Sequence, residues 1–136
     1  MLLLGKPATG VMIVLFALTA LAGCFAHVTG NVAVDGVPFV ALDCRSGAAY
    51  GGWGVEISDT AGRRLRLGAN LDGALGVAVF QPGATKGDYL GSCGAVDVQA
   101  QHSRVDGIVN LEGAATFACQ AGGHRISGRM SFENCH

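Results

Sequence analysis

The chain has 136 residues, about the length of a single domain, and half of these residues are hydrophobic. Charged residues make up 14%, glycine supplies 22 positions, and the net charge is −1. A composition that is this apolar and this weakly charged excludes a disordered chain and a coiled coil. The irregular spacing of the glycines excludes collagen. The low net charge argues against a nucleic-acid partner, because binding to phosphates needs a clustered basic surface.

The N-terminal segment has the pattern of a targeting signal. Lys6 is the only charged residue before Asp35, and residues 11–22 form an apolar core with one threonine. This core has the length of the apolar region of a signal peptide, whereas a membrane-spanning helix needs about 20 residues. We therefore expect residues 1–23 to form a signal helix. A longer apolar count, from Ala8 to Ala26, leaves an uncleaved membrane anchor as the alternative.

The residues that follow this core resemble the lipobox of bacterial lipoproteins: Leu21, Ala22, Gly23 and Cys24. The resemblance implies a diacylglycerol on the Cys24 thiol, removal of residues 1–23 before Cys24, and a further acyl chain, such as palmitate, on the new amine. Membrane lipid is then the expected partner, because several acyl chains together anchor a protein stably. Phe25 follows the cysteine where Asp would retain such a protein in the inner membrane. The resemblance therefore implies a cell-envelope location, at the outer membrane where the cell has one.

The tether between lipid and domain is expected to be short. Only Phe25, Ala26 and His27 separate Cys24 from the patterned sequence that begins by Val28. Three residues span on the order of 10 Å. We expect residues 24–27 to hold a single domain, residues 28–136, close to the lipid headgroups.

The mature chain would keep four further cysteines: Cys44, Cys93, Cys119 and Cys135. An even number of cysteines in an exported domain predicts two disulfides, and three connectivities are compatible with the sequence. Of these we favour Cys44–Cys93 with Cys119–Cys135. The cysteine spacings and the positions of the histidines do not match a metal site, so neither a metal nor another cofactor is expected.

Alternating apolar and polar residues predict β-strands through most of the remaining chain. Such runs occupy residues 53–58, 64–67, 75–80, 96–101, 116–120 and 125–132. Asp-Gly pairs at 35–36, 72–73 and 106–107 are typical of hairpins, and residues 59–62 and 121–123 also indicate turns. We expect an all-β fold, either one antiparallel β-sandwich or a small barrel of about eight to nine short strands.

The candidate catalytic residues are dispersed. The possible bases are the four histidines, His27, His102, His124 and His136. Ser103 follows His102 directly, but neighbours in a strand point to opposite faces. A carboxylate pair drawn from Asp97, Asp106 and Glu112 could serve a glycosidase, although solvated strand and turn positions explain these residues more simply. We therefore expect a protein that is not an enzyme, with an enzyme of unrecognised site as an alternative.

Two groups of residues suggest binding. Tyr50 and Trp53 flank glycines, and an aromatic ring beside such a backbone can stack on a sugar or anchor a partner. Trp53 is also in phase with the apolar positions 55 and 57, which favours a place in the core. Arg63, Arg64 and Arg66 could face anionic headgroups or simply form a solvated hairpin face.

The sequence thus predicts a membrane-anchored lipoprotein that acts as an envelope interaction or structural module. Its further partner would be an envelope protein or a glycan. The alternative is a β-sandwich that binds a glycan or a small apolar ligand.

Overall fold

The computed structural model describes residues 25–51 and 53–136, which fold into a nine-stranded sheet. Its elements in chain order are β1 (His27–Val34), β2 (Val37–Pro38), β3 (Ala41–Ser46), the 3-10 turn η1 (Gly47–Tyr50), β4 (Val55–Asp59), β5 (Arg64–Ala69), β6 (Ala74–Phe80), β7 (Asp88–Val105), β8 (Ile108–Ala121) and β9 (His124–Cys135). Every neighbouring pair is antiparallel, in the order β2-β1-β9-β8-β7-β6-β5-β4-β3. The expected all-β class is confirmed, and the expected signal helix lies outside the described residues.

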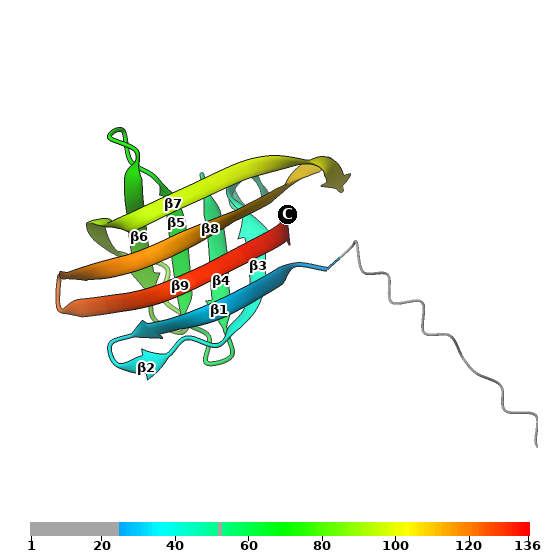
Figure 1. The fold of residues 1–136 in the computed structure, drawn as a ribbon. Coiled ribbons are helices and arrows are strands. Elements are labelled where there is room, and N and C mark those ends of the chain that lie inside the picture. The colour runs from blue at the N-terminus through cyan, green and yellow to red at the C-terminus, as the bar shows by residue number, and fades with distance from the viewer. Residues whose placement is uncertain (1–24, 52) are drawn as a thin grey trace, which may run out of the picture.

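The sheet curls into an open half-barrel with a front and a back layer (Figure 1). Strands β1, β9 and β8 form the front layer, and β3 to β6 form the back layer, which the front strands cross obliquely. Strand β7 belongs to both layers, because its first part pairs with β6 and residues 94–105 pair with β8. Strands β7, β8 and β9 have 18, 14 and 12 residues, so the expectation of short strands is wrong for this half of the chain.

The turns lie where their residue types predicted them. The Asp-Gly pairs at 35–36, 72–73 and 106–107 connect β1 to β2, β5 to β6, and β7 to β8. Asp35 and Asp106 have φ angles of 54° and 50°, and the glycine after each is also left-handed. This is the backbone of the tight turns that Asp-Gly favours in hairpins.

The core lies between the two layers. The alternation predicted for the back strands is confirmed, because Val55 and Ile57 in β4, and Leu65 and Leu67 in β5, are completely buried. Front-layer side chains such as Ile126 meet them from the other side of the core. Within the described ranges, no helix has the length and apolarity needed to cross a membrane.

The structure contains two disulfides, and their connectivity corrects the expected one. Cys44 in β3 is bonded to Cys135 in β9, with their Cα atoms 5.0 Å apart, and Cys93 in β7 is bonded to Cys119 in β8, with a Cα separation of 4.7 Å. The favoured pairing of Cys44 with Cys93 and of Cys119 with Cys135 is therefore wrong. The curl of the sheet brings β3 against β9, although five strands, β4 to β8, lie between them in the sheet order. Cys93 and Cys119, in contrast, are on adjacent strands.

Candidate functional site

The described chain begins beside the end of the last strand. The backbone carbonyl of Phe25 accepts a hydrogen bond from Nδ2 of Asn134 at 3.2 Å, and β1 starts two residues later, at His27. Phe25 itself is exposed. The lipobox residues Leu21, Ala22, Gly23 and Cys24 lie outside the described residues, as does the side chain of Tyr50. The chain therefore enters the domain next to the C-terminal end of β9.

Trp53 is not a core residue, contrary to its expected phase. The residue is 58% exposed, whereas Val55 and Ile57 are fully buried. The alternation fails at Gly54, which has a φ of +68° and packs so closely on the Leu67 carbonyl that no side chain would fit. Because an extended strand begins only after this glycine, the indole lies on the outer face of the back layer.

On that face the indole lies over a glycine of β5. A methyl group at Gly68 would overlap Cζ3 and Cε3 of Trp53, so the ring occupies the place of the missing side chain. Gly76 of β6 pairs directly with Gly68. A methyl group at Gly76 would lie 3.1 Å from the Tyr89 hydroxyl oxygen, which shows that a second aromatic residue reaches the neighbouring glycine.

Tyr89, in β7, is 60% exposed, and its hydroxyl donates a hydrogen bond to Oδ1 of Asn70 at 2.6 Å. Opposite positions on paired strands are separated by about 5 Å, so the two rings meet the surface at adjacent points. We call the surface formed by Trp53, Tyr89, Asn70, Gly68 and Gly76 the aromatic platform.

A row of outward-facing residues continues the aromatic platform across four strands. Glu56 pairs with Arg66, Arg66 pairs with Ala78, and Ala78 pairs with Tyr89. Nε of Arg66 is 2.7 Å from Oε2 of Glu56, and its guanidinium lies 4.4 Å from the centre of the Phe80 ring. The platform is therefore bordered by an ion pair of fixed geometry.

Sequence reasoning identified Trp53 but missed Tyr89 and Asn70. Residues 88–95 are rich in glycine and serine and lack an apolar alternation, so Tyr89 could not be assigned to a strand face. The available signal was Gly68 and Gly76, because glycine inside a strand often marks the close approach of another group.

The arginines of the β4–β5 hairpin make contacts within the domain. Nε of Arg63 is 2.8 Å from Oδ2 of the buried Asp59, and its Nη2 donates to the Pro38 carbonyl at 2.8 Å. Arg64 and Arg66 share Glu56 and lie over Phe80. Ion pairs and ring contacts within the domain thus engage these three cations.

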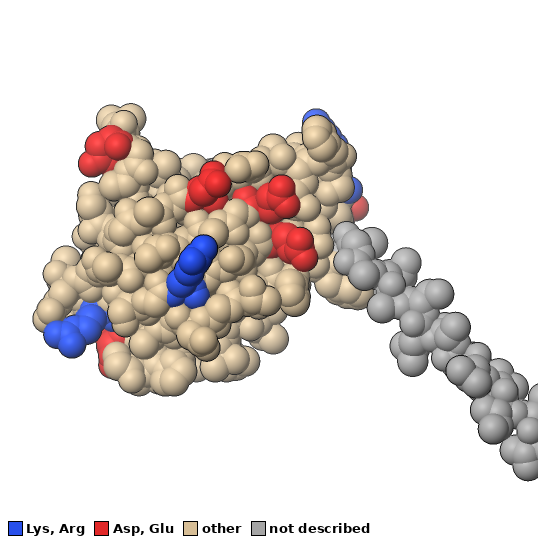
Figure 2. Space-filling view, viewed as in Figure 1, with Lys and Arg blue, Asp and Glu red and all other residues tan. Residues whose placement is uncertain are grey.

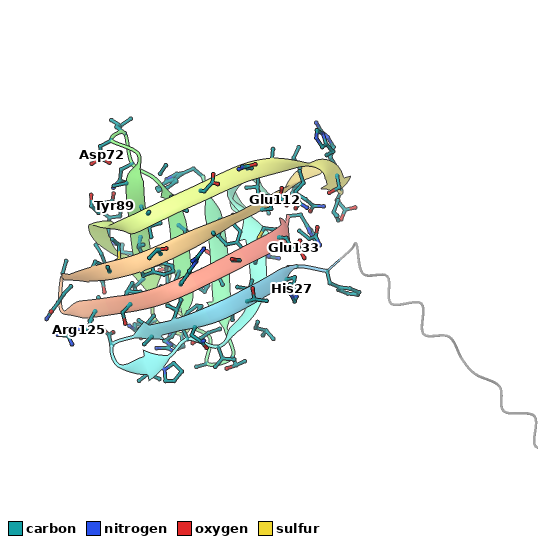
Figure 3. The ribbon with its side chains drawn as sticks, viewed as in Figure 1. His27, Asp72, Tyr89, Glu112, Arg125 and Glu133 are labelled. Carbon is teal, nitrogen blue, oxygen red and sulfur yellow. A yellow bond between two sulfur atoms is a disulfide. The ribbon has the colours of Figure 1, made fainter. Side chains whose placement is uncertain are left out.

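A shallow hollow of about 420 Å³ lies on the outer face of the front layer, lined by His27, Gln99, Glu112, Ser131 and Glu133 among others. Figure 2 shows acidic side chains gathered over this layer, and Figure 3 places Glu112 and Glu133 near the end where His27 begins β1. In the part of the chain that the structure describes, no three His, Cys, Asp or Glu residues are arranged to hold a metal ion.

The other catalytic candidates are dispersed in structural contacts. Ser103 accepts a hydrogen bond from Nδ2 of Asn110 at 2.8 Å, and Asp97 accepts one from Gln99 at 3.2 Å. Asp106 occupies the left-handed position of the β7–β8 turn. These groups stabilise strands and turns in the geometry observed.

His124 joins three segments at one end of the domain. Its Nδ1 lies 2.8 Å from Oδ2 of Asp35, and its Nε2 lies 2.8 Å from Oδ2 of Asp88. Asp35 also accepts a hydrogen bond from the Arg125 backbone at 2.8 Å. The ring can donate to both carboxylates only as the imidazolium, because a neutral ring has a single N–H. Hydrogen bonds to Asp35 and Asp88 accordingly raise the pKa of His124, while the bond from His124 lowers the pKa of Asp35.

Thermal stability should therefore depend on pH through this contact. The pKa of His124 is higher in the folded chain than its ordinary 6.5, so its contribution is complete below pH 6.5 and is lost as pH rises through the raised value. The Asp35 contribution is complete above its ordinary pKa of 3.8 and is lost as pH falls through the lowered value. The melting temperature should be highest between pH 3.8 and pH 6.5 and should fall at higher pH. His124→Gln should abolish this fall, and His27→Gln should leave it unchanged. An unaltered pH profile in His124→Gln would contradict the prediction.

Comparisons of the chain with protein-family models, with curated proteins and with solved structures found no match. Three places on the described surface are candidate functional sites, and each must be judged by its geometry: the aromatic platform, the hollow beside His27, and the His124 contact. The His124 contact holds three segments of the fold together. The platform combines exposed rings with fixed polar groups, the combination that ligand sites use.

Proposed function

We propose that this protein is a lipid-anchored module of the bacterial cell envelope that acts by interaction rather than by catalysis. The observation that carries the proposal is the short distance along the chain between Cys24 and the folded domain. Phe25 is already hydrogen-bonded to Asn134, and β1 begins at His27. An acylated Cys24 would therefore hold the domain against the membrane surface, within on the order of 10 Å.

The disulfides support an exported location. Cys44, Cys93 and Cys135 are buried, and both bridges connect strands of the sheet. Disulfides of this kind persist in oxidising compartments such as the bacterial periplasm and are rare in the cytosol. Two structural disulfides in a small domain thus agree with a signal that directs the chain out of the cytoplasm.

The roles of the polar side chains favour interaction over catalysis. His124 with Asp35 and Asp88 holds three segments together, and Asp59 with Arg63 closes the turn between β4 and β5. In both groups, ionisable residues lie close together because they stabilise the fold. The outer location of the module is proposed from Phe25, which stands where Asp would retain a lipoprotein in the inner membrane.

Mass spectrometry of the mature protein, isolated from membranes of a bacterium with two membranes, tests the anchor. The N-terminal residue should be Cys24 carrying a diacylglycerol and an acyl chain, and Cys24→Ala should abolish the modification. Phe25→Asp should move the protein to the inner membrane, while Phe25→Leu should leave its location unchanged. A mature chain that retains residues 1–23 with an unmodified Cys24 would refute the proposal in favour of an uncleaved anchor.

A further inference from the structure

Two exposed aromatic residues on one face are the starting point. Trp53 and Tyr89 come from segments 36 positions apart in the chain, yet both reach a pair of directly opposed glycines, Gly68 and Gly76. They remain 58% and 60% exposed. Large aromatic side chains usually contribute much of the buried area of a domain, and their exposure side by side marks a surface for binding.

From this surface we infer that the aromatic platform binds a carbohydrate, with pyranose rings stacking on Trp53 and Tyr89. A pyranose ring has apolar faces of C–H bonds and a rim of hydroxyl groups. A protein recognises it by placing aromatic rings against the faces and a few hydrogen-bonding side chains at the rim. The platform has both parts in one place.

The polar groups beside the rings are held in position. The hydrogen bond from Tyr89 to Oδ1 of Asn70 restrains the phenol ring, and the single amide nitrogen of Asn70 takes no part in this bond. Arg66 is oriented by Glu56 and keeps 37% of its side-chain surface exposed. The cationic group of Arg66 therefore stays in contact with solvent at the border of the platform, where a polar ligand would meet it.

The openness of the platform selects a sugar over a small apolar ligand. An apolar ligand binds where a pocket removes most of its surface from water. A sugar chain, in contrast, can place one face on aromatic rings and keep its other hydroxyls hydrated. Rings that stay more than half exposed, above a floor of Gly76 and Ala78, suit an extended chain of sugars.

The position of Tyr89 also agrees with a glycan of the envelope. Figure 3 places Tyr89 and Asp72 at the end of the domain away from His27, where the chain enters β1. If Cys24 is anchored in lipid, Tyr89 lies at the end of the domain away from the headgroups. This orientation rests on the proposed function, but the binding of sugar to the platform does not.

The chain has a single tryptophan, so emission excited selectively from tryptophan rather than tyrosine reports on Trp53 alone. The full chain, in a detergent without a sugar headgroup, is titrated with two soluble β-1,4-linked hexasaccharides, cellohexaose and chitohexaose. At least one should produce a saturable change in emission, with an affinity also measurable by calorimetry. Tyr89→Ala should weaken binding by at least about tenfold, as expected when an aromatic anchor is truncated.

Two further variants separate stacking from folding. Gly68→Ala should weaken binding while keeping the tryptophan, because the added methyl displaces the indole. Leu71→Ala removes an exposed side chain from the adjacent turn and should bind like the wild type. Circular dichroism checks each fold, and if Gly68→Ala unfolds, Tyr89→Ala decides the result.

Three results would overturn the inference. The first is the absence of a response to both hexasaccharides up to about 10 mM, a concentration that would reveal even weak binding. The second is sugar binding that Tyr89→Ala leaves unchanged. The third is binding of an apolar dye at Trp53 without any response to sugar. The anchor test reads the mass of the N-terminus, so failure of one proposal is distinguishable from failure of the other.

Discussion

Replacing Cys44 and Cys135 together by alanine is expected to lower the free energy of unfolding by about 4.5 kcal/mol, according to the entropy of loop closure in the unfolded chain. This disulfide joins residues 91 positions apart, whereas Cys93 and Cys119 are 26 apart. The shorter loop should be worth about 3.5 kcal/mol by the same reasoning. The Cys44–Cys135 bridge also fastens β3, the edge of the back layer, to β9, so its loss should loosen the curl of the sheet.

Chemical denaturation of the two double variants measures this difference. The connectivity itself can be read from a tryptic digest without reduction, because cleavage after Arg45, Lys86, Arg104 and Arg125 separates the four cysteines. Peptide 87–104 should be linked to peptide 105–125. A link from peptide 87–104 to the peptide ending at Arg45 would contradict the structure and restore the pairing first favoured from the sequence.

Local patterns predicted the local parts of the fold. Alternation placed Val55, Ile57, Leu65 and Leu67 in the core, because strand side chains change face at each residue. Asp-Gly pairs located three hairpin turns through the left-handed backbone that these turns require. Each of these predictions depends on residues that are close in sequence, which is why the sequence was sufficient.

The features that the sequence could not give depend on contacts between distant segments. The Cys44–Cys135 bridge follows from the curl that brings β3 to β9, and no spacing reports a curl. Trp53 left the expected face because of the backbone at Gly54. The first part of β7 was missed because its glycines and serine carry no alternation.

The candidate site was predictable only in part for the same reason. Trp53 was recognisable as an aromatic residue among glycines, but its partner Tyr89 lies in another strand. The contact of His124 with Asp35 and Asp88 joins three separate segments, so local patterns predicted only a turn residue at that position. Ligand sites and structural ties alike are assembled from residues that the fold brings together.

Gly94→Ala should be nearly as damaging as the loss of a disulfide, because Gly94 forms the corner at which β7 passes from the back layer to the front layer. Its φ is +129°, and a methyl group there would collide with the Thr116 carbonyl oxygen of β8. Backbone strain of about 1–3 kcal/mol and overpacking of about 1–3 kcal/mol together predict a loss of roughly 4 kcal/mol. Neither strand can yield easily, since the neighbouring Cys93 is bonded to Cys119 of β8.

Gly107→Ala is the matched control for this corner. Gly107 also has a positive φ, +80°, but nothing lies within 4 Å of the position that a methyl group would take. Its substitution adds strain without a collision and should cost about 1–2 kcal/mol. Denaturation midpoints of the two variants, compared where the denaturant dependence of the unfolding free energy is the same, separate the backbone strain from the steric collision. If Gly94→Ala were no more destabilising than Gly107→Ala, the close approach of β7 and β8 at Gly94 would not constrain the corner, and the curl would have to be maintained by side-chain packing and the Cys44–Cys135 disulfide.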